Sequence, residues 1–416
     1  MRESKNLEFK EKVSNTFLKT VTAFSNYNGG KIIFGLNDQG EVVGIDNLEK
    51  EMLRIENKIN DNITPQVDFS LSVDEAKKLI ILQVEPGEDA PYYYKSKTFR
   101  RNDSSTIQVD RIELSKLILL GQNKTYDALP AKDGQILFGY LEKQFQEKLG
   151  VETVYLDVLK SLDLVDKHNV MTNAGYLLSD NNSRNILDIV RFGKSQDIIR
   201  NRYQINSCSL LEAYDRGVEI FRDHYQIEKI DGAYRRKIEL VPEKAFREAL
   251  ANAIVHRDWM VDSYIQIAME DEWIVITSPG GLPGDLTESE YLEGRISKMR
   301  NPIIGNIFFR LDIIESFGTG IRRIKNAYSH SSRKPIFTVY ENSIEVKLPL
   351  ISLLDELTED ERKVYYAIEN DISASSGISE ATGFGKNKVL LILNELLEDG
   401  YVKKIGRGRG TKYSIE

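Results

Sequence analysis

The chain has 416 residues, which is too long for one ordinary hydrophobic core and indicates roughly two to four domains. Its apolar and charged fractions, 41% and 29%, are those of a globular protein and exclude a disordered one. The net charge of −8 excludes a basic coating protein, so any contact with nucleic acid must come from local basic patches. The single cysteine, Cys208, excludes an internal disulfide and a cysteine-rich zinc site.

The first residues, MRESKNLEFKEK, are charged from the start and contain no apolar signal segment. The sequence also lacks the run of roughly 18 apolar residues that a membrane span requires. We therefore expect a cytoplasmic protein with no membrane partner.

Residues 1–125 alternate helix and strand signals, which is typical of one compact α+β or α/β domain. Phe17, Val21 and Phe24 lie at helix spacing and predict a helix over Asn15–Asn26. Further helices are expected at 48–60 and 110–121. Strands are expected at 31–35, 41–45, 67–73 and 79–84, with a hairpin formed by 92–95 and 98–101.

The rest of the chain alternates elements less regularly. In residues 126–240 we expect helices at 140–149, 155–164, 172–178 and 210–225, and a strand at 188–193. Residues 241–350 predict a helix at 242–257, strands at 264–269 and 273–277, and two glycine-bearing loops. The last part predicts helices at 358–370, 376–383 and 385–399, then a strand and a basic hairpin.

Two glutamates near the N-terminus are candidates for metal-dependent chemistry. In a strand, Glu8 and Lys10 share one face, with Glu3 just upstream. Carboxylates at the edge of a buried sheet can hold a divalent cation and activate water at a phosphate. A solvated strand edge with an ion pair of little energetic value gives the same pattern, so spacing alone leaves both interpretations open.

The surrounding sequence resembles the N-terminal domain of the Schlafen/AlbA-type family. The motif ES-x-x-x-EFK, the segment KTVTAFSNYNGGKIIFGLNDQGEVVGI and a basic turn at 100–106 carry the resemblance, which runs over about residues 3–122. It implies nucleic-acid binding and, as in some Schlafen proteins, cleavage of RNA with Mn²⁺ or Mg²⁺ at two glutamates and an aspartate. Glu3 and Glu8 match the glutamates. Asp38 is the remaining candidate for the aspartate, because Asn37 occupies the first position of that turn.

Basic side chains gather near the predicted hairpin, next to the three tyrosines at 92–94. Cationic and aromatic groups together suit phosphate contact and base stacking. A hairpin whose tyrosines pack on the core would have the same composition. On the first interpretation, the residues that bind DNA or RNA here are Lys10, Lys95, Lys97, Arg100 and Arg101.

The helix expected at 242–257 has two opposite stripes. At about 100° per residue, Glu248, Asn252 and His256 share a polar stripe opposite the apolar one. Such a stripe is usually the wet face of a helix. Two glycine loops follow at 278–284 and 316–321, and glycine lets backbone amides approach a phosphate.

This order of helix, strand, glycine loop, second glycine loop and helix resembles the GHKL ATPase fold. The closer resemblance is to the divergent branch found behind Schlafen/AlbA-type domains, over about residues 244–328. It implies ATP and Mg²⁺ as cofactors. The aspartate that reads adenine is absent, and Ser278-Pro279 stands in its place.

The GHKL resemblance also assigns roles to residues of this site. Glu248 matches the residue that orients or deprotonates water, and Asn252 matches the residue that binds magnesium beside the phosphates. The loops around the nucleotide contain Gly280, Gly281, Gly318 and Gly320.

The C-terminal region resembles a winged helix-turn-helix. Thr358 and Glu361 have the spacing of a capping box that starts the first helix. The resemblance places the third helix in the major groove and the hairpin along the DNA backbone. A winged helix that mediates dimerisation would have the same elements. The residues expected to contact DNA are Lys386, Lys388, Arg407 and Arg409, with Asn387 beside them.

The expected fold class is therefore α+β multidomain. Its parts are a Schlafen/AlbA-type α/β domain at 1–125, a helical and mixed linking region at 126–240, a GHKL-like α/β sandwich at 241–350 and a winged helix-turn-helix at 356–416.

Three functions fit this plan. The first is a nucleic-acid-binding, ATP-responsive transcriptional regulator, expected to be a homodimer or higher homo-oligomer. The second is a metal-dependent endoribonuclease of stress or phage defence that uses Glu3, Glu8 and Asp38. The third is an ATPase, with Glu248 as its base, that does not bind nucleic acid.

Overall fold

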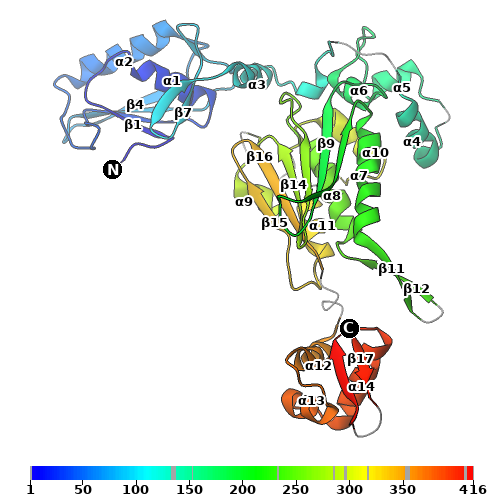
Figure 1. Cartoon of the computed structure of the whole chain (residues 1–416). Helices are drawn as coiled ribbons and strands as arrows, with labels where there is room; N and C mark the ends of the chain where they lie inside the picture. The colour runs from blue at the N-terminus through cyan, green and yellow to red at the C-terminus, as the bar shows by residue number, and fades with distance from the viewer. Residues whose placement is uncertain are drawn as a thin grey trace. The chain divides into compact units, whose positions relative to one another are not determined.

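The computed structural model describes residues 2–132, 137–151, 153–231, 234–283, 286–294, 298–315, 318–351, 357–406 and 410–415. Contacts within the chain divide it into two units, Met1–Leu129 and Pro130–Glu416. Both units combine helices and sheets, which confirms the predicted α+β multidomain class (Figure 1). No helix within the described ranges is long and apolar enough to cross a lipid bilayer.

The first unit is built on a four-stranded sheet with the order β1-β2-β5-β4. β1 runs parallel to β2, and the other pairs are antiparallel. Two further pairs, β3-β6 and β7-β8, lie outside this sheet. The strands are β1 (Leu7–Lys10), β2 (Gly30–Phe34), β3 (Ile63–Thr64), β4 (Phe69–Asp74), β5 (Leu79–Val84), β6 (Tyr93–Tyr94), β7 (Phe99–Asn102) and β8 (Ser105–Gln108).

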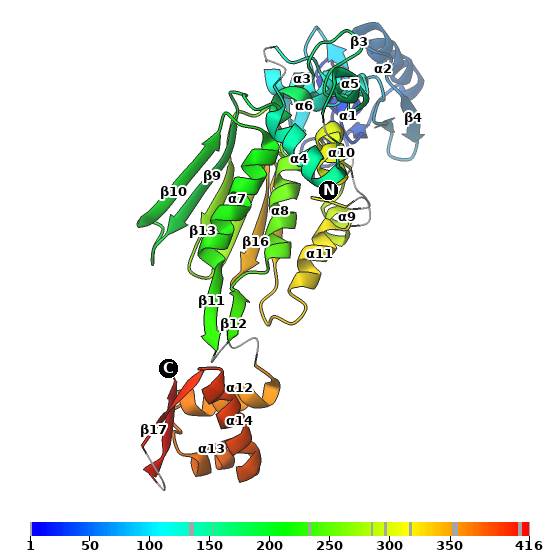
Figure 2. The same cartoon turned by 90° about the vertical axis from the view of Figure 1, so that its right-hand side faces the viewer.

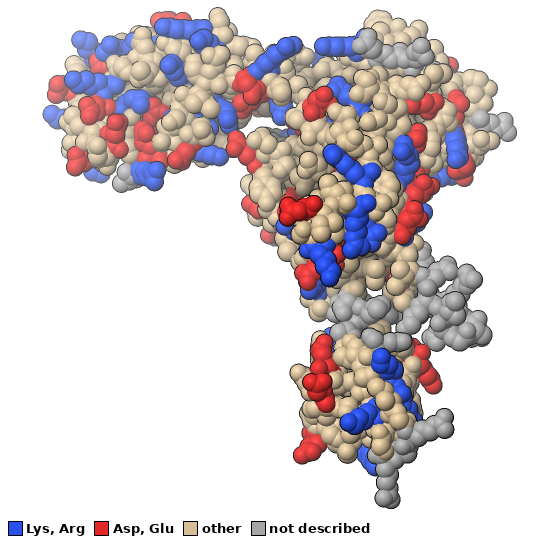
Figure 3. Space-filling model, in the orientation of Figure 1, with Lys and Arg blue, Asp and Glu red and all other residues tan. Residues whose placement is uncertain are grey.

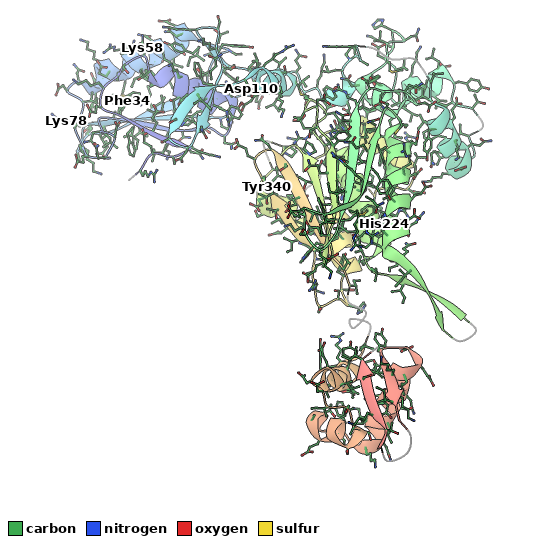
Figure 4. All side chains as sticks on the ribbon, in the orientation of Figure 1. Phe34, Lys58, Lys78, Asp110, His224 and Tyr340 are labelled. Carbon is green, nitrogen blue, oxygen red and sulfur yellow. The ribbon has the colours of Figure 1, made fainter. Side chains whose placement is uncertain are left out.

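The helices of this unit are α1 (Phe17–Asn26), α2 (Leu48–Asn62) and α3 (Arg111–Gly121), followed by the short 3-10 helix η1 (Tyr126–Ala128). α1 is buried along nearly its whole length, and Phe17 meets Phe34 of β2 edge-on, with ring centroids 5.2 Å apart. Figure 4 labels Phe34 in this core and Asp110 at the start of α3. The Asp110 side chain accepts a hydrogen bond from Glu113 N at 2.8 Å and caps that helix.

Two expected elements of the first unit are wrong. The strand at 41–45 is absent, and one isolated bridge joins Val42 to Leu36. Gly40, just before this segment, and Gly44, within it, have φ of 80° and 81°, which is incompatible with an extended run, and Val42 is exposed. The expected hairpin of 92–95 with 98–101 is reduced to one isolated antiparallel bridge, between Tyr94 and Lys97, because β6 pairs with β3 and β7 pairs with β8.

The second unit contains a six-stranded sheet with the order β10-β9-β13-β14-β16-β15. Two of its strands precede residue 240, so the expected boundary between a linking region and the next domain falls inside this sheet. The strands are β9 (Asn185–Phe192), β10 (Ile199–Asn206), β13 (Ile265–Met269), β14 (Trp273–Pro279), β15 (Ile336–Val339) and β16 (Ser343–Pro349). A separate hairpin joins β11 (Gln226–Asp231) to β12 (Tyr234–Glu239).

The helices α7 (Leu210–Tyr225) and α8 (Glu243–Val255) pack side by side on one face of this sheet (Figure 2). Ile267, Ile276 and Val346 are in register on adjacent strands and are buried on a single face, so they form a continuous apolar surface. The remaining helices are α4 (Gly139–Leu149), α5 (Leu156–Ser161), α6 (Asn173–Leu178), α9 (Glu288–Glu293), α10 (Pro302–Arg310) and α11 (Gly320–Ala327).

Residues 357–415 form a module with its own core. The helices α12 (Glu359–Glu369), α13 (Ser375–Thr382) and α14 (Lys386–Glu398) precede the hairpin of β17 (Val402–Ile405) and β18 (Lys412–Ile415). Val364, Ile378 and Leu393 are fully buried, one from each helix. The expected capping box is present, because Thr358 and Glu361 each accept a hydrogen bond from the other's backbone N–H.

Candidate functional site

A pocket of the second unit lies beside the polar stripe of α8. Glu248, Asn252 and His256 line it, together with residues 280–283 and Gly318–Gly320. Its volume is about 100 Å³, several times the roughly 10–15 Å³ that one water molecule requires. The polar stripe of this helix therefore faces a cavity and not the open surface.

Glu248 is the buried member of the stripe. Its Oε1 accepts a hydrogen bond from Asn252 Nδ2 at 3.4 Å, and its Oε2 lies 3.4 Å from Arg323 Nη1. Burial raises the pKa of Glu248, while the Arg323 guanidinium opposes part of that rise. A carboxylate with a raised pKa can take a proton from water more readily than an exposed one, as a general base must.

The second glycine loop brings the start of α11 against this pair. A Cβ on Gly320 would lie 2.6 Å from both Glu248 Oε1 and Asn252 Nδ2, so a larger residue here would have to displace the ends of these two side chains. Gly318 has φ of +64°, which also favours glycine. Among the described residues, the buried Thr319 Oγ1 has no hydrogen-bond partner. A helix N-terminus binds anions, so this set of groups fits a phosphate with a divalent cation beside it.

The first glycine loop is fixed at the other end of the pocket. Gly280 has φ of +106°, and a Cβ there would lie 2.7 Å from Asp258 Cβ. Arg300 Nη1 lies 3.4 Å from Asp258 Oδ2, and Arg300 also donates to the carbonyl of Gly281. This ion pair holds the loop in place. Ser278, which stands where the adenine-reading aspartate was expected, donates from Oγ to Ala253 O at 2.8 Å.

Three residues that line or support the pocket were not singled out from the sequence. Arg323 pairs with Glu248 and with Glu315, and it follows Gly320 by about one helical turn, which is the local signal for it. Arg300 has no comparable signal, since its partner is 42 positions away (300 − 258 = 42). Tyr291 lines the pocket, and burial raises the pKa of its hydroxyl to about 12.

The N-terminal glutamates do not form the expected metal site. Glu8 Oε2 accepts hydrogen bonds from Arg101 Nη1 and Thr20 Oγ1, both at 2.5 Å, and its Oε1 lies 2.6 Å from Lys10 Nζ. The carboxylate is therefore already surrounded by two cations and a hydroxyl. Glu3 Oε1 instead accepts from the backbone N–H of Phe9 at 2.8 Å.

Asp38, the third expected ligand, is exposed in the turn after β2. Its neighbour Asn37 stabilises that turn, because Asn37 Oδ1 accepts from Gln39 N at 3.0 Å and from Glu41 N at 2.8 Å. No group of three His, Cys, Asp or Glu side chains that could hold a metal ion occurs within the described ranges. The prediction that Glu3, Glu8 and Asp38 share a cation is thus not supported by the geometry.

Comparison with protein families assigns the first unit. Residues 3–110 match the family model described as "Schlafen, AlbA_2". The chain therefore carries a Schlafen AlbA_2 domain. Residues 262–348 match the model described as "Putative ATP-dependent DNA helicase recG C-terminal", so an ATPase-like domain follows. The two matches confirm the Schlafen/AlbA-type domain and the ATPase-like domain that the sequence resemblance predicted.

Two solved structures share low sequence identity with this chain. The DIP2311 protein of Corynebacterium diphtheriae is 17% identical, with a TM-score of 0.47, and the match covers 99% of this chain and 92% of that one. The N-terminal domain of a "Putative ATP-dependent DNA Helicase RecG-related Protein" from Nitrosomonas europaea is 18% identical, with a TM-score of 0.19, over 26% of this chain and 80% of that one. No curated protein sequence matches the chain.

The basic residues expected to bind nucleic acid in the AlbA_2 domain divide into two groups. Arg101 and Lys10 contact Glu8, and the Arg101 side chain is only 6% exposed, so its charge is engaged inside the domain and is not accessible to a phosphate in this structure. Arg100 pairs with Glu113 at 3.3 Å. Lys95 and Lys97 are exposed and accessible to a phosphate. On the face drawn in Figure 3, the Lys and Arg side chains of this unit are interspersed with Asp and Glu.

The tyrosines beside these lysines have a structural role in the AlbA_2 domain. Tyr92 and Tyr94 are buried in its core, and burial raises the pKa of the Tyr92 hydroxyl. The expectation that bases stack on them is therefore wrong for these two residues.

The residues of the C-terminal module that were expected to contact DNA differ in whether they are available to it. Lys386 and Asn387 are exposed at the start of α14, where backbone N–H groups also point outward. Lys388 instead pairs with Asp360 at 2.5 Å and lies over the Phe384 ring. Arg407 and Arg409 lie outside the described residues.

Proposed function

We propose that the chain is a nucleic-acid-binding regulator whose ATPase-like domain binds ATP with Mg²⁺ and thereby controls the nucleic-acid-binding parts. The observation that carries this proposal is the pocket beside α8. It brings together a buried carboxylate, an amide and a glycine-rich helix N-terminus, at Glu248, Asn252 and Gly318–Gly320. Charged phosphates and a hard divalent cation require groups of these kinds.

Each of these residues has a role in nucleotide binding. Asn252 Oδ1 is the cation ligand, since a side-chain carbonyl is the type of oxygen that Mg²⁺ accepts. The first N–H groups of α11 bind phosphate oxygens, and the missing Cβ of Gly320 permits that approach. When bound, Mg²⁺ neutralises charge on the phosphates. Glu248, whose pKa is raised by burial, orients a water molecule and accepts its proton.

The matched family range, 262–348, begins after α8. The roles of Glu248 and Asn252 therefore rest on the pocket geometry and on the GHKL resemblance. We extend that resemblance to the whole six-stranded sheet, which α7 and α8 cover on one face.

The control step involves Arg323. Its guanidinium pairs with Glu248 and Glu315 and is 25% exposed, so an incoming anion can compete for it. A nucleotide that attracts Arg323 away from Glu248 favours an arrangement of α11 in which this ion pair is broken over the one in which it is intact. The nucleotide therefore binds the two arrangements with different affinity. Such a difference is the condition for any ligand to shift a conformational equilibrium.

Nucleic acid contacts come from two separate surfaces. In the AlbA_2 domain, Lys95 and Lys97 are exposed beside the β7-β8 pair. In the C-terminal module, three helices are followed by a two-stranded hairpin, which is the order of elements in a winged helix. We infer from this order that Lys386, at the start of α14, contacts the DNA groove.

A gel-shift titration tests the proposal. We expect full-length protein to shift duplex DNA or RNA at low salt, and ATP with Mg²⁺ to change the apparent affinity at least about threefold. Asn252→Ala should abolish the ATP effect and keep the basal shift. Lys97→Met, which removes a proposed nucleic-acid contact, should weaken the basal shift and keep the ATP effect. No shift with either nucleic acid at low salt, or an ATP effect that survives Asn252→Ala, would contradict the proposal.

A further inference from the structure

The two ends of the pocket have different chemistry. Glu248 and His256 are separated by eight positions on α8, a rise of about 12 Å along the helix. The Glu248 end carries Arg323 and the glycine loop that suits phosphates. The His256 end carries Ser278 and Arg300. A nucleotide whose phosphates occupy the first end therefore extends its base toward the second.

His256 is a polar side chain at that second end whose ring is available for hydrogen bonding. Its ring nitrogens have no hydrogen-bond partner among the residues that the structure describes. Burial, with the nearby Arg300 adding to the effect, lowers the pKa of His256 to about 4. The ring is therefore neutral at pH 7 and carries one donor and one acceptor nitrogen.

Two other polar side chains at this end, Ser278 and Arg300, already make contacts within the chain, although Arg300 Nε has no hydrogen-bond partner among the described residues. Ser278 Oγ donates its proton to Ala253 O, and Arg300 is bound to Asp258 and to the carbonyl of Gly281. Arg300 can only donate hydrogen bonds, so the His256 ring is the side chain of these three that can either donate to a ligand group or accept from it.

We propose that His256 contacts the base of the bound nucleotide and makes the site tolerant of both 6-amino and 6-oxo purines. A carboxylate only accepts hydrogen bonds, so an aspartate here would favour the amino group of adenine. A neutral imidazole accepts from an amino group in one tautomer and donates to a carbonyl oxygen in the other. This inference rests on the proposed nucleotide site and assigns its base specificity.

A ligand-truncation experiment tests the proposal on the full-length chain. Binding of ATP, inosine triphosphate and inorganic tripolyphosphate is measured by calorimetry with Mg²⁺, for wild type, His256→Phe and His256→Gln. We expect wild type to bind the two nucleotides within about fivefold of each other, and His256→Phe to weaken both by about fivefold. Tripolyphosphate, which has no base, should bind all three proteins equally. His256→Gln keeps a donor and an acceptor and should retain most of the affinity.

The outcomes separate this inference from the proposed function. Equal weakening of tripolyphosphate and ATP by His256→Phe, or unchanged ATP binding, would show that His256 does not contact the base. If wild type bound ATP about a hundredfold or more tightly than inosine triphosphate, the proposed tolerance of 6-amino and 6-oxo purines would be overturned. Wild-type protein that binds none of the three ligands would overturn the nucleotide site itself, and this inference with it.

Discussion

Removing one partner of the Glu8–Arg101 pair should destabilise the AlbA_2 domain strongly. Both side chains are only 6% exposed, and their atoms are 2.5 Å apart. Loss of one partner of a buried pair costs about 3–5 kcal/mol, because the other charge stays buried. In Arg101→Met, Lys10 and Thr20 still contact Glu8, so we expect the lower end, about 3 kcal/mol.

The effect can be assigned to one unit because both tryptophans, Trp259 and Trp273, lie in the other. Hydrogen–deuterium exchange of peptides from β1 and β2 reports on the AlbA_2 domain, and tryptophan emission during urea unfolding reports on the second unit. A loss of about 3 kcal/mol corresponds to roughly a hundredfold loss of protection in β1 and β2. The emission midpoint should not move.

Two further variants complete this test. The exposed substitution Lys97→Met should change protection by less than about 0.5 kcal/mol. The double variant Glu8→Gln/Arg101→Met should lose less than the sum of its single changes, because it removes both charges of the buried pair and leaves neither one without its partner. If the hydrogen-exchange protection of β1 and β2 in Arg101→Met stayed within about threefold of that in wild type, the reasoning would be refuted. A nuclease assay that uses Glu8→Ala as its inactive control must therefore first establish that the domain remains folded.

Three other changes have expected outcomes. Gly320→Ala places a Cβ against Glu248 and Asn252, so ATP affinity measured by calorimetry should fall about tenfold while thermal stability stays within about 1 kcal/mol; unchanged affinity would exclude this loop from the site. The pKa of His256 is about 4 in the folded chain and 6.5 as its ordinary value, so the unfolded chain binds the proton first. As pH falls from 6.5 to 4, wild type should therefore lose up to about 3 kcal/mol of its free energy of unfolding relative to His256→Phe. Urea unfolding followed by tryptophan emission measures this difference, and free energies of unfolding that run parallel with pH in the two proteins would contradict the prediction. Lys386→Ala should lower the slope of log affinity against log salt for DNA by about 1, whereas Lys388→Ala, already paired with Asp360, should change it less.

Local patterns predicted the helices better than the strands. The helix at 210–225 was predicted with the bounds that α7 has, because its apolar residues repeat at helix spacing over many turns. β10 was missed because most of its side chains are exposed and Ile205 alone is fully buried, so no alternation marks it. The glycines at 40 and 44 carried the signal against a strand at 41–45, through the positive φ that both adopt.

The candidate sites were predictable only in part, for a related reason. The stripe of Glu248, Asn252 and His256 is visible because one helix sets its spacing. The partner of Glu8 is 93 positions away, and no local pattern connects Arg101 to it. The basic turn therefore predicted phosphate contacts at a residue whose charge is used inside the domain.

The two candidate catalytic carboxylates are held in similar ion pairs, but the two pairs differ in how easily a ligand can break them. Glu8 and Glu248 are both buried, and each is paired with an arginine from a later element. Arg101 is 6% exposed, contacts Glu8 at 2.5 Å and also donates to Thr106 Oγ1 at 2.9 Å. Any cation that binds Glu8 must displace this network.

The contact of Glu248 is weaker and more open. Arg323 is 25% exposed, lies 3.4 Å from Glu248 and shares its charge with Glu315, which is 56% exposed. Attraction between charges falls with distance and with access of water, so the second pair costs far less to separate than the first. The pocket beside α8 can therefore release its carboxylate to a ligand, whereas the Glu8 pair stabilises the AlbA_2 fold. This difference in exchange favours an ATP-responsive binder over a metal-dependent nuclease.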